Sequence, residues 1–436
     1  MTLPKCILTF LLTAVAAGAN AGVTIHASLN TPTMAASGGS LFLQLSFEVP
    51  RPQVRDRTSL NLSVVLDRSG SMAEQGKLDY AKNAICALVD QLRPDDVFSL
   101  VIYDDIVEVP FSAGPVTDRG LIKSLIREIR PRNSTNLGGG MLEGFHQAGL
   151  NTRREYVNRV VLFSDGLANV GVTNVQELTS NARRYRDRGI SLTTMGMGLD
   201  YAEDMMMALA EAGGGNYYFI ESPLGIASIL EREFGLLRSV YACKAIINLR
   251  VGQGVRIIDV IGHDWHAGSG SCTVALGDLY GGDARDITVA LEVSSGTGSR
   301  QIVEGAMEFE EGGSGPARSE PFSAHLRYSS NPGDVDRDRN MRAQAKADIA
   351  VSTRAVEHAA RAIDEGKMEE AHRILGAAKA SLEASPAAPA AGSAGTAVKD
   401  QAARLDQYRS MIGKETDRRR AKKSIQYENY QTQNQK

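Results

Sequence analysis

An aspartate and two serines follow an apolar segment in the sequence SVVLDRSGSM, which covers residues 63–72. Asp67, Ser69 and Ser71 stand at alternate positions, so one short loop offers a carboxylate and two hydroxyl groups. Carboxylate and hydroxyl oxygens are hard ligands that suit Mg²⁺ or Mn²⁺ better than a softer metal ion. We therefore expect this loop to take part in binding a divalent cation.

Two further segments offer oxygen-bearing side chains of the same kind. The sequence PRNSTNLGGG carries Ser134 and Thr135 just before a glycine-rich helix start. The sequence VVLFSDG places Asp165 at the end of an apolar strand. If these segments end at the same edge of one sheet, their side chains can meet the first loop around a single ion.

The elements between these loops predict such a sheet. From residue 59 to residue 240, apolar strands alternate with helical patterns, and the strands include LNLSVVLD, DVFSLVIYD, NRVVLFSD and ISLTTMGMG. Near-continuous apolar strands between helices indicate a mostly parallel sheet that is covered on both faces. We expect a doubly wound α/β domain over residues 59–240, with the three loops at the carboxyl ends of its strands, where such folds bind ligands.

The motifs DRSGS, STN and FSDG, in this order within one α/β domain, resemble the metal-ion-dependent adhesion site of the von Willebrand factor A domain family. That site consists of an Asp-x-Ser-x-Ser loop, a threonine from a second loop and an aspartate from a third. The resemblance covers about residues 59–240. It implies a set of five metal-site residues, Asp67, Ser69, Ser71, Thr135 and Asp165.

The resemblance also implies how the site works. In the family's ligand-bound state, the hydroxyl groups contact the metal and the aspartates act largely through bound water. The cation, Mg²⁺ by preference with Mn²⁺ or Ca²⁺ as alternatives, then stays electrophilic and accepts an Asp or Glu side chain from another protein. The implied function is an exported, non-enzymatic binding protein of the adhesion type.

The other candidate sites in the sequence are weaker. No histidine is placed to activate the serines, and His146 follows the threonine loop as a packing or surface residue. The sequence GHDWHAG contains His263 and His266, but a turn with a half-buried tryptophan explains it better than a metal site. The sequence DVDRDRN imitates a calcium loop, yet Arg339 and Ala345 stand where that loop needs glycine and glutamate. A phosphate-binding loop and a dinucleotide-binding glycine motif are both absent from the sequence.

Short alternating segments flank the α/β domain and predict a β-sandwich. Its few candidate strands suggest that the α/β domain is inserted in the sandwich or followed by it. After the sandwich the sequence becomes helical and rich in alanine. The expected parts are a signal peptide (1–21), amino-terminal sandwich strands (22–58), the α/β domain (59–240), the rest of the sandwich (241–330), a helical hairpin (331–383), a low-complexity linker (384–398), and a last helix with a disordered tail (399–436).

The first 21 residues have the layout of a secretory signal peptide, with a lysine, an apolar stretch and a small-residue cleavage site. No later segment is apolar enough to span a membrane. The formal net charge of −3 gives no general attraction to nucleic acid, and the basic residues 417–423 are interpreted as a solvated helix end. We expect a chain that is exported to the cell envelope or secreted.

Three cysteines remain after the signal peptide. Cys86 lies on the apolar side of a predicted helix and is expected to be a buried free thiol. Cys243 and Cys272 lie in the strand-rich region and could pair, because an exported location permits disulfides. The sequence does not fix the distance between them, so the pairing stays open.

Outside the α/β domain, the layout resembles exported bacterial A-domain proteins and the inter-α-trypsin inhibitor heavy chains. Two other functions also remain open. One is an envelope assembly or scaffold protein that uses its helical carboxyl-terminal region as the main contact. The other is an accessory subunit of an ATPase or chelatase complex, against which the signal peptide argues because those complexes work in the cytoplasm.

Overall fold

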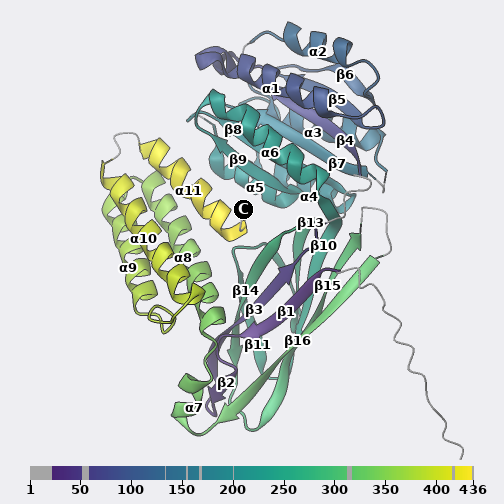
Figure 1. The fold of residues 1–436 in the computed structure, drawn as a ribbon. Coiled ribbons are helices and arrows are strands. Elements are labelled where there is room, and N and C mark those ends of the chain that lie inside the picture. Colours follow the sequence, from purple (N-terminus) through teal and green to yellow (C-terminus); the bar gives the residue numbers. More distant parts are fainter. Residues whose placement is uncertain are drawn as a thin grey trace, which may run out of the picture.

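The computed structural model describes residues 22–51, 58–132, 134–153, 156–165, 169–199, 201–311, 317–414 and 418–434. These residues form an α/β domain, a β-sandwich and a group of carboxyl-terminal helices (Figure 1). The expected signal peptide, residues 1–21, lies outside the described residues. None of the helices in the described part is long and apolar enough to cross a membrane.

A six-stranded sheet forms the centre of the α/β domain. Its strands stand in the order β6-β5-β4-β7-β8-β9, and all neighbours are parallel except β5 and β6. This confirms the predicted doubly wound sheet, although the half-exposed antiparallel edge strand β6 was not predicted. The bounds are β4 Ser59–Asp67, β5 Val97–Tyr103, β6 Val107–Pro115, β7 Tyr156–Ser164, β8 Ile190–Met197 and β9 Gly214–Ile220.

Helices cover both faces of this sheet. Successive residues of a strand point to opposite faces, and apolar residues stand on both of them. In β4, Leu62 and Val64 belong to the core beneath α1, α2 and α6, whereas Val65 belongs to the core beneath α3, α4 and α5. The helices have the bounds α1 Lys77–Gln91, α2 Arg119–Glu128, α3 Leu137–Leu150, α4 Val175–Asp187, α5 Glu203–Gly213 and α6 Ile226–Arg238.

Two glycines let α3 approach the sheet closely. A Cβ atom on Gly140 would lie 2.5 Å from the ring of Tyr103, and one on Gly144 would lie 2.3 Å from Val65. Any side chain at either position would push α3 away from the sheet. The glycine-rich sequence therefore sets the position of the Thr135 loop, which leads directly into this helix.

The β-sandwich consists of two sheets in the orders β1-β3-β14-β11 and β12-β13-β10-β15-β16-β2. Strand β3 pairs with β14 along its whole length, so the amino-terminal strands complete the sandwich and the α/β domain is an insertion within it. The bounds are β1 Thr24–Leu29, β2 Thr33–Ala35, β3 Gly39–Glu48, β10 Val240–Val251, β11 Val255–Ile261, β12 Trp265–Gly268, β13 Ser271–Tyr280, β14 Ala284–Val293, β15 Ser299–Glu311 and β16 Ala317–Ser329.

The cysteines of the sandwich do not pair. Strand register places Cys272 of β13 opposite Leu249 of β10, whereas Cys243 stands near the other end of β10. Cys86, Cys243 and Cys272 are all free thiols, and Cys86 is buried as expected.

The carboxyl-terminal region differs from the prediction. The helices are α7 Pro332–Arg337, α8 Met341–Asp364, α9 Met368–Glu383, α10 Ser393–Lys414 and α11 Arg418–Asn434. Helix α10 thus begins inside the predicted linker, and α11 occupies most of the segment predicted to be a disordered tail. Figure 1 shows α11 between the other carboxyl-terminal helices and the α/β domain.

Helix α11 is ordered because its polar sequence finds partners on distant parts of the chain. Lys422 and Lys423 are buried rather than solvated, and both pair with Glu203 of α5. Lys422 also reaches Asp364 of α8 at 2.6 Å. Tyr430 lies against Tyr217 with ring centroids 5.6 Å apart. A basic sequence alone does not reveal such acidic and aromatic partners, which explains the wrong prediction.

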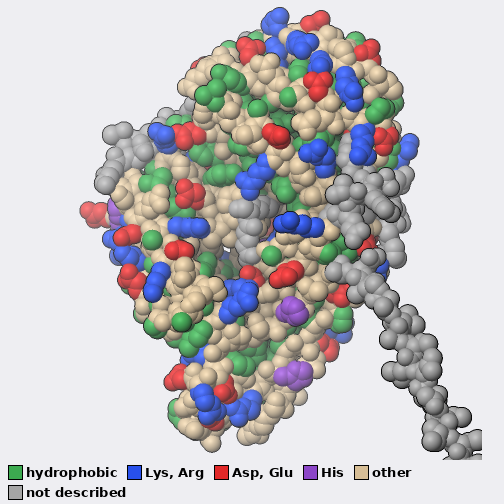
Figure 2. Space-filling view, viewed as in Figure 1, with side chains coloured by type: hydrophobic (Ala, Val, Ile, Leu, Met, Phe, Trp, Pro, Cys, Tyr) green, Lys and Arg blue, Asp and Glu red, His purple; other side chains and the backbone are tan. Residues whose placement is uncertain are grey.

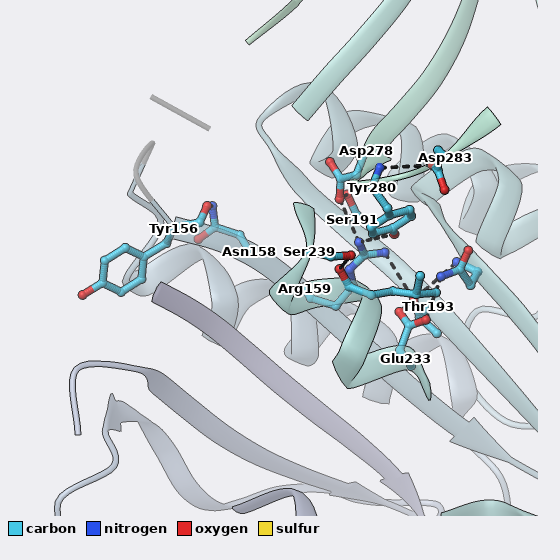
Figure 3. A network of polar contacts seen from close by, with 12 residues as sticks. Tyr156, Asn158, Arg159, Ser191, Thr193, Glu233, Ser239, Asp278, Tyr280 and Asp283 are labelled. Atoms are coloured by element: carbon cyan, nitrogen blue, oxygen red, sulfur yellow. Dashed lines mark hydrogen bonds and ion pairs between the residues drawn. The ribbon is translucent and has the colours of Figure 1, made fainter. Parts of the chain in front are cut away.

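A buried ionic network joins the α/β domain to the sandwich (Figure 3). Arg159, near the amino end of β7, lies 2.7 Å from Asp278 of β13 and also donates to Tyr280 at 3.1 Å. Its other terminal nitrogen donates to Thr193, whose hydroxyl donates to Glu233 of α6 at 2.6 Å. The sandwich is therefore attached to the amino-terminal edge of the sheet, and the carboxyl edge points away from this junction.

This junction predicts unequal effects for two ion pairs between the same domains. Asp278→Ala leaves the Arg159 charge buried without its partner and should lower the free energy of unfolding by about 3–5 kcal/mol. Asp264→Ala removes the partner of Arg183 from an exposed pair and should cost less than about 1 kcal/mol. Urea unfolding followed by circular dichroism measures both, and equal losses would contradict the assignment.

The packing of α11 predicts its resistance to trypsin. The Tyr430→Ala variant loses a buried aromatic contact and should open α11, so that cleavage after Lys422 and Lys423 becomes at least about tenfold faster than in the wild type. Tyr80→Ala, which alters a tyrosine that is 41% exposed, serves as the control and should leave the rate unchanged. Equally fast cleavage of the wild type at these lysines would show that α11 is not held in this way.

Candidate metal centre

The order of the strands reverses between β4 and β7, and two of the predicted metal-site residues lie at that point. Asp67 is the last residue of β4, and Asp165 directly follows β7. The two strands are parallel neighbours, so both carboxylates lie at the same edge. Ligands of doubly wound folds bind in the crevice at such a switch point.

Hydrogen bonds join four of the five predicted residues. The backbone N–H of Ser69 donates to Asp67 Oδ1 at 2.8 Å, and the hydroxyl oxygens of Ser69 and Ser71 lie 3.1 Å apart. Ser71 Oγ then donates to Asp165 Oδ1 at 2.7 Å. The first and third predicted loops thus converge and bring their oxygens together.

Backbone contacts position the fifth residue, Thr135. Its N–H donates to the side chain of Asn169 at 3.0 Å, and its carbonyl accepts from the N–H of Asn169 at 3.1 Å. In the same loop, Arg132 N–H donates to the carbonyl of Arg68 at 2.7 Å. The Thr135 loop is therefore fastened to both of the other loops, and Thr135 itself is buried.

A group of four charged residues, not identified from the sequence, fixes two of these loops. Arg68, between Asp67 and Ser69, pairs with Asp104 at 2.7 Å and with Glu108 at 2.8 Å. Arg132 of the Thr135 loop contacts the same two carboxylates at 3.3 and 3.2 Å. The Arg68 guanidinium also holds the pKa of Glu108 below its usual value. The available signal was an acidic residue at the end of a predicted strand, a second acidic residue four positions later, and two arginines in the metal loops.

The two aspartates carry charge into a region without access to water. Both are fully buried, and burial raises the pKa of Asp67 from 3.8 to about 6, with a further contribution from the charge of Asp165. Hydrogen bonds from Ser69 and Ser164 lower this pKa only in part. A buried carboxylate with a raised pKa gains from a nearby cation, so the charge at this edge favours a metal.

The donor set fits a hard divalent cation. Within the described ranges, no group of three or more histidine, cysteine, aspartate or glutamate side chains is close enough to hold a metal ion. The predicted set has two carboxylates, and its other donors are hydroxyl groups, which suit Mg²⁺ or Mn²⁺ and not a thiophilic metal. Asp67, Ser69, Ser71, Thr135 and Asp165 are the residues that would hold the ion.

The site contains one further charged residue that the sequence analysis missed. Lys77, the first residue of α1, has its ammonium nitrogen 2.7 Å from Asp165 Oδ2. The position of this lysine, six residues after Ser71, was visible in the sequence, but nothing there showed that its side chain turns inward.

The remaining histidine candidates lie away from this edge. His146 is exposed on α3. His263 is half-buried near the sandwich junction, and desolvation lowers its pKa to about 4, so it is uncharged at neutral pH.

Comparisons with known proteins concern mainly the α/β domain. A family model described as the von Willebrand factor type A domain matches residues 61–232. Protein YfbK of Escherichia coli is 31% identical over 176 residues, which are 40% of this chain and 30% of YfbK. Inter-alpha-trypsin inhibitor heavy chain H4 of Homo sapiens is 27% identical over 194 residues, which are 42% of this chain and 20% of the heavy chain. This chain therefore spans less than a third of the length of these relatives.

Two solved structures match nearly the whole chain. A von Willebrand factor type A protein from Catenulispora acidiphila has a TM-score of 0.73 at 15% identity and covers 95% of this chain and 97% of its own. The ArnB paralog VWA2 from Sulfolobus acidocaldarius has a TM-score of 0.61 at 16% identity, with 95% and 99% covered. At such low identity the likeness concerns the fold alone, and it extends beyond the α/β domain.

The raised pKa of Asp67 predicts the pH dependence of stability in the metal-free protein. The folded state binds the proton more tightly than the unfolded state, so ionised Asp67 costs stability above pH 6, and the cost disappears as the pH falls toward 4. In EDTA at pH 8, Asp67→Asn should raise the free energy of unfolding by up to about 3 kcal/mol, and at pH 4.5 by only about 1 kcal/mol.

Asp96→Asn is the matched control. Asp96 is also buried, but its two oxygens accept backbone N–H groups from Leu60 and Arg93, so an amide should destabilise the protein at pH 8. A loss of stability for Asp67→Asn at both pH values, measured by urea unfolding, would contradict the unfavourable charge assigned to Asp67.

Proposed function

We propose that the protein is an exported, non-enzymatic binding protein that captures an acidic side chain of a protein partner through a divalent cation, because residues 61–232 match the family model of the von Willebrand factor type A domain. The observation that supports this most is the hydrogen-bonded chain from Asp67 through Ser69 and Ser71 to Asp165 at the switch point of the sheet.

In this proposal the residues have two roles. Ser69, Ser71 and Thr135 contribute neutral hydroxyl oxygens directly to the ion, and Asp67 and Asp165 compensate its charge from behind through bound water. When bound, the cation supplies Lewis acidity toward a carboxylate oxygen. Neutral direct ligands keep that acidity high, because a bound water separates the carboxylates of Asp67 and Asp165 from the ion.

The loops around the ion must supply much of the selectivity. One metal-bound carboxylate is a small contact, and stable complexes need a larger buried surface around such an anchor. Acidic and basic side chains are interspersed over the face in Figure 2, and the net charge is only −3, so a general electric field is not expected to select the partner. Arg132 and Glu108, both almost half exposed, are placed to contact the partner beside the ion.

Export is part of the proposal, and it rests on the signal peptide expected from residues 1–21. Cleavage before Gly22 would release the sandwich, the α/β domain and the helices as one chain. A protein outside the cytoplasm meets millimolar divalent cations, which suits a site of modest affinity.

A pair of neighbouring variants tests the proposal. Immobilised wild-type protein should retain a partner from an envelope extract in Mg²⁺ and release it in EDTA. Thr135→Ala should lose this EDTA-sensitive retention by at least about tenfold, because one direct ligand is missing. Ser134→Ala removes the adjacent hydroxyl and should retain the partner as the wild type does. Retention that ignores both EDTA and Thr135→Ala would overturn the proposal.

A further inference from the structure

Lys77 brings a fixed positive charge to the metal site. Its side chain is 5% exposed, and its ammonium nitrogen lies 2.7 Å from Asp165 Oδ2. The other oxygen of Asp165 accepts the hydrogen bond from Ser71. One oxygen of Asp165 therefore faces the hydroxyl groups of Ser69 and Ser71, and the other faces Lys77. The carboxylate thus lies between these hydroxyl groups and the ammonium group.

The surrounding backbone is shaped to admit this side chain. Between Ser71 and Lys77, Gln75 has a φ of 53° and Gly76 a φ of 70°, and these left-handed residues turn the chain so that α1 begins facing the site. A non-glycine residue in this conformation costs free energy, which surrounding contacts must offset. On the other side, a Cβ atom on Gly198 would lie 3.3 Å from Lys77 Cε, so glycine leaves the room that the ammonium occupies.

The charges of the site can be counted from these residues. Asp67 and Asp165 contribute two negative charges and Lys77 one positive charge, which leaves one negative charge before an ion binds. A divalent cation turns this into one positive charge. Without Lys77, the same loaded site would be neutral. Charges this close interact strongly in a buried region, so the difference affects both the cation and any ligand of the cation.

We propose that Lys77 is a positioning residue whose charge weakens the hold of the empty site on the cation and strengthens the hold of the loaded site on an anionic ligand. The inference rests on the proposed function and names its ligand class: a carboxylate is favoured over a neutral amide or hydroxyl group. The cation and the partner's carboxylate then bind cooperatively. The bound cation gives the site a net positive charge that attracts the carboxylate, and the bound carboxylate neutralises this charge and so helps to retain the cation.

The test compares cation affinities of the full chain without any partner. Lys77→Gln and Lys77→Met remove the charge, and the glutamine variant keeps a hydrogen-bond donor in case the apolar one fails to fold. Lys82→Gln is the matched control, because Lys82 is also buried on α1 but pairs with Asp79 and the carbonyl of Ile129. Affinity for Mn²⁺ is measured by electron paramagnetic resonance of the free ion, and affinity for Tb³⁺ by its luminescence.

The expected result is that Lys77→Gln binds Mn²⁺ at least about tenfold more tightly than the wild type and Tb³⁺ by a larger factor, since repulsion grows with the charge of the ion. Lys82→Gln should match the wild type. Equal or weaker binding by both Lys77 variants would overturn the inference and leave the proposed function standing. Binding by the Lys77 variants but not by the wild type would support the inference and overturn the proposed function, and binding by none of them would overturn both.

Discussion

Two buried carboxylates lie at the ends of adjacent parallel strands. Compensating their negative charge is the requirement that determines the other contacts of the site. Asp67 and Asp165 are both fully buried, and burial together with the charge of Asp165 raises the pKa of Asp67. Hydroxyl groups of Ser71 and Ser164 and the ammonium of Lys77 offset part of this cost. In our proposal a divalent cation compensates the rest of the cost of burying these carboxylates. The same arrangement that destabilises the metal-free protein therefore favours binding of the cation.

The other two parts of the chain contact the α/β domain at separate places. The sandwich is attached at the opposite edge of the sheet, where Arg159 reaches Asp278, and α11 covers the flank formed by α5 and β9. Helix α6 ends at Arg238 and β10 begins at Val240, so this connection between the α/β domain and the sandwich is a single residue.

The sequence was sufficient for features whose cause is local or periodic. Apolar strands such as residues 60–66 predicted the sheet, and the motifs at Asp67, Thr135 and Asp165 predicted loops at its carboxyl edge. The structure brings Asp67, Ser69, Ser71 and Asp165 into one hydrogen-bonded chain. Whether these residues hold a metal stays a prediction.

Features that depend on contacts between distant segments were beyond the sequence. Lys422 and Lys423 looked like solvated residues because their partners Glu203 and Asp364 lie far away along the chain. The same holds for Lys77, whose inward direction follows from the backbone at Gln75 and Gly76 and from the space beside Gly198. A charged side chain is read as solvated by default, and only the folded chain shows which ones are buried with a partner.

The most direct measurement is a crystal structure of the protein grown with Mn²⁺, in which anomalous scattering locates the ion. The account predicts a single strong peak enclosed by oxygens of the Asp67, Thr135 and Asp165 loops, with one coordination position filled by solvent or by a carboxylate of a neighbouring molecule. Absence of the ion at saturating Mn²⁺, or an ion whose coordination is completed entirely by the protein's own atoms, would contradict it.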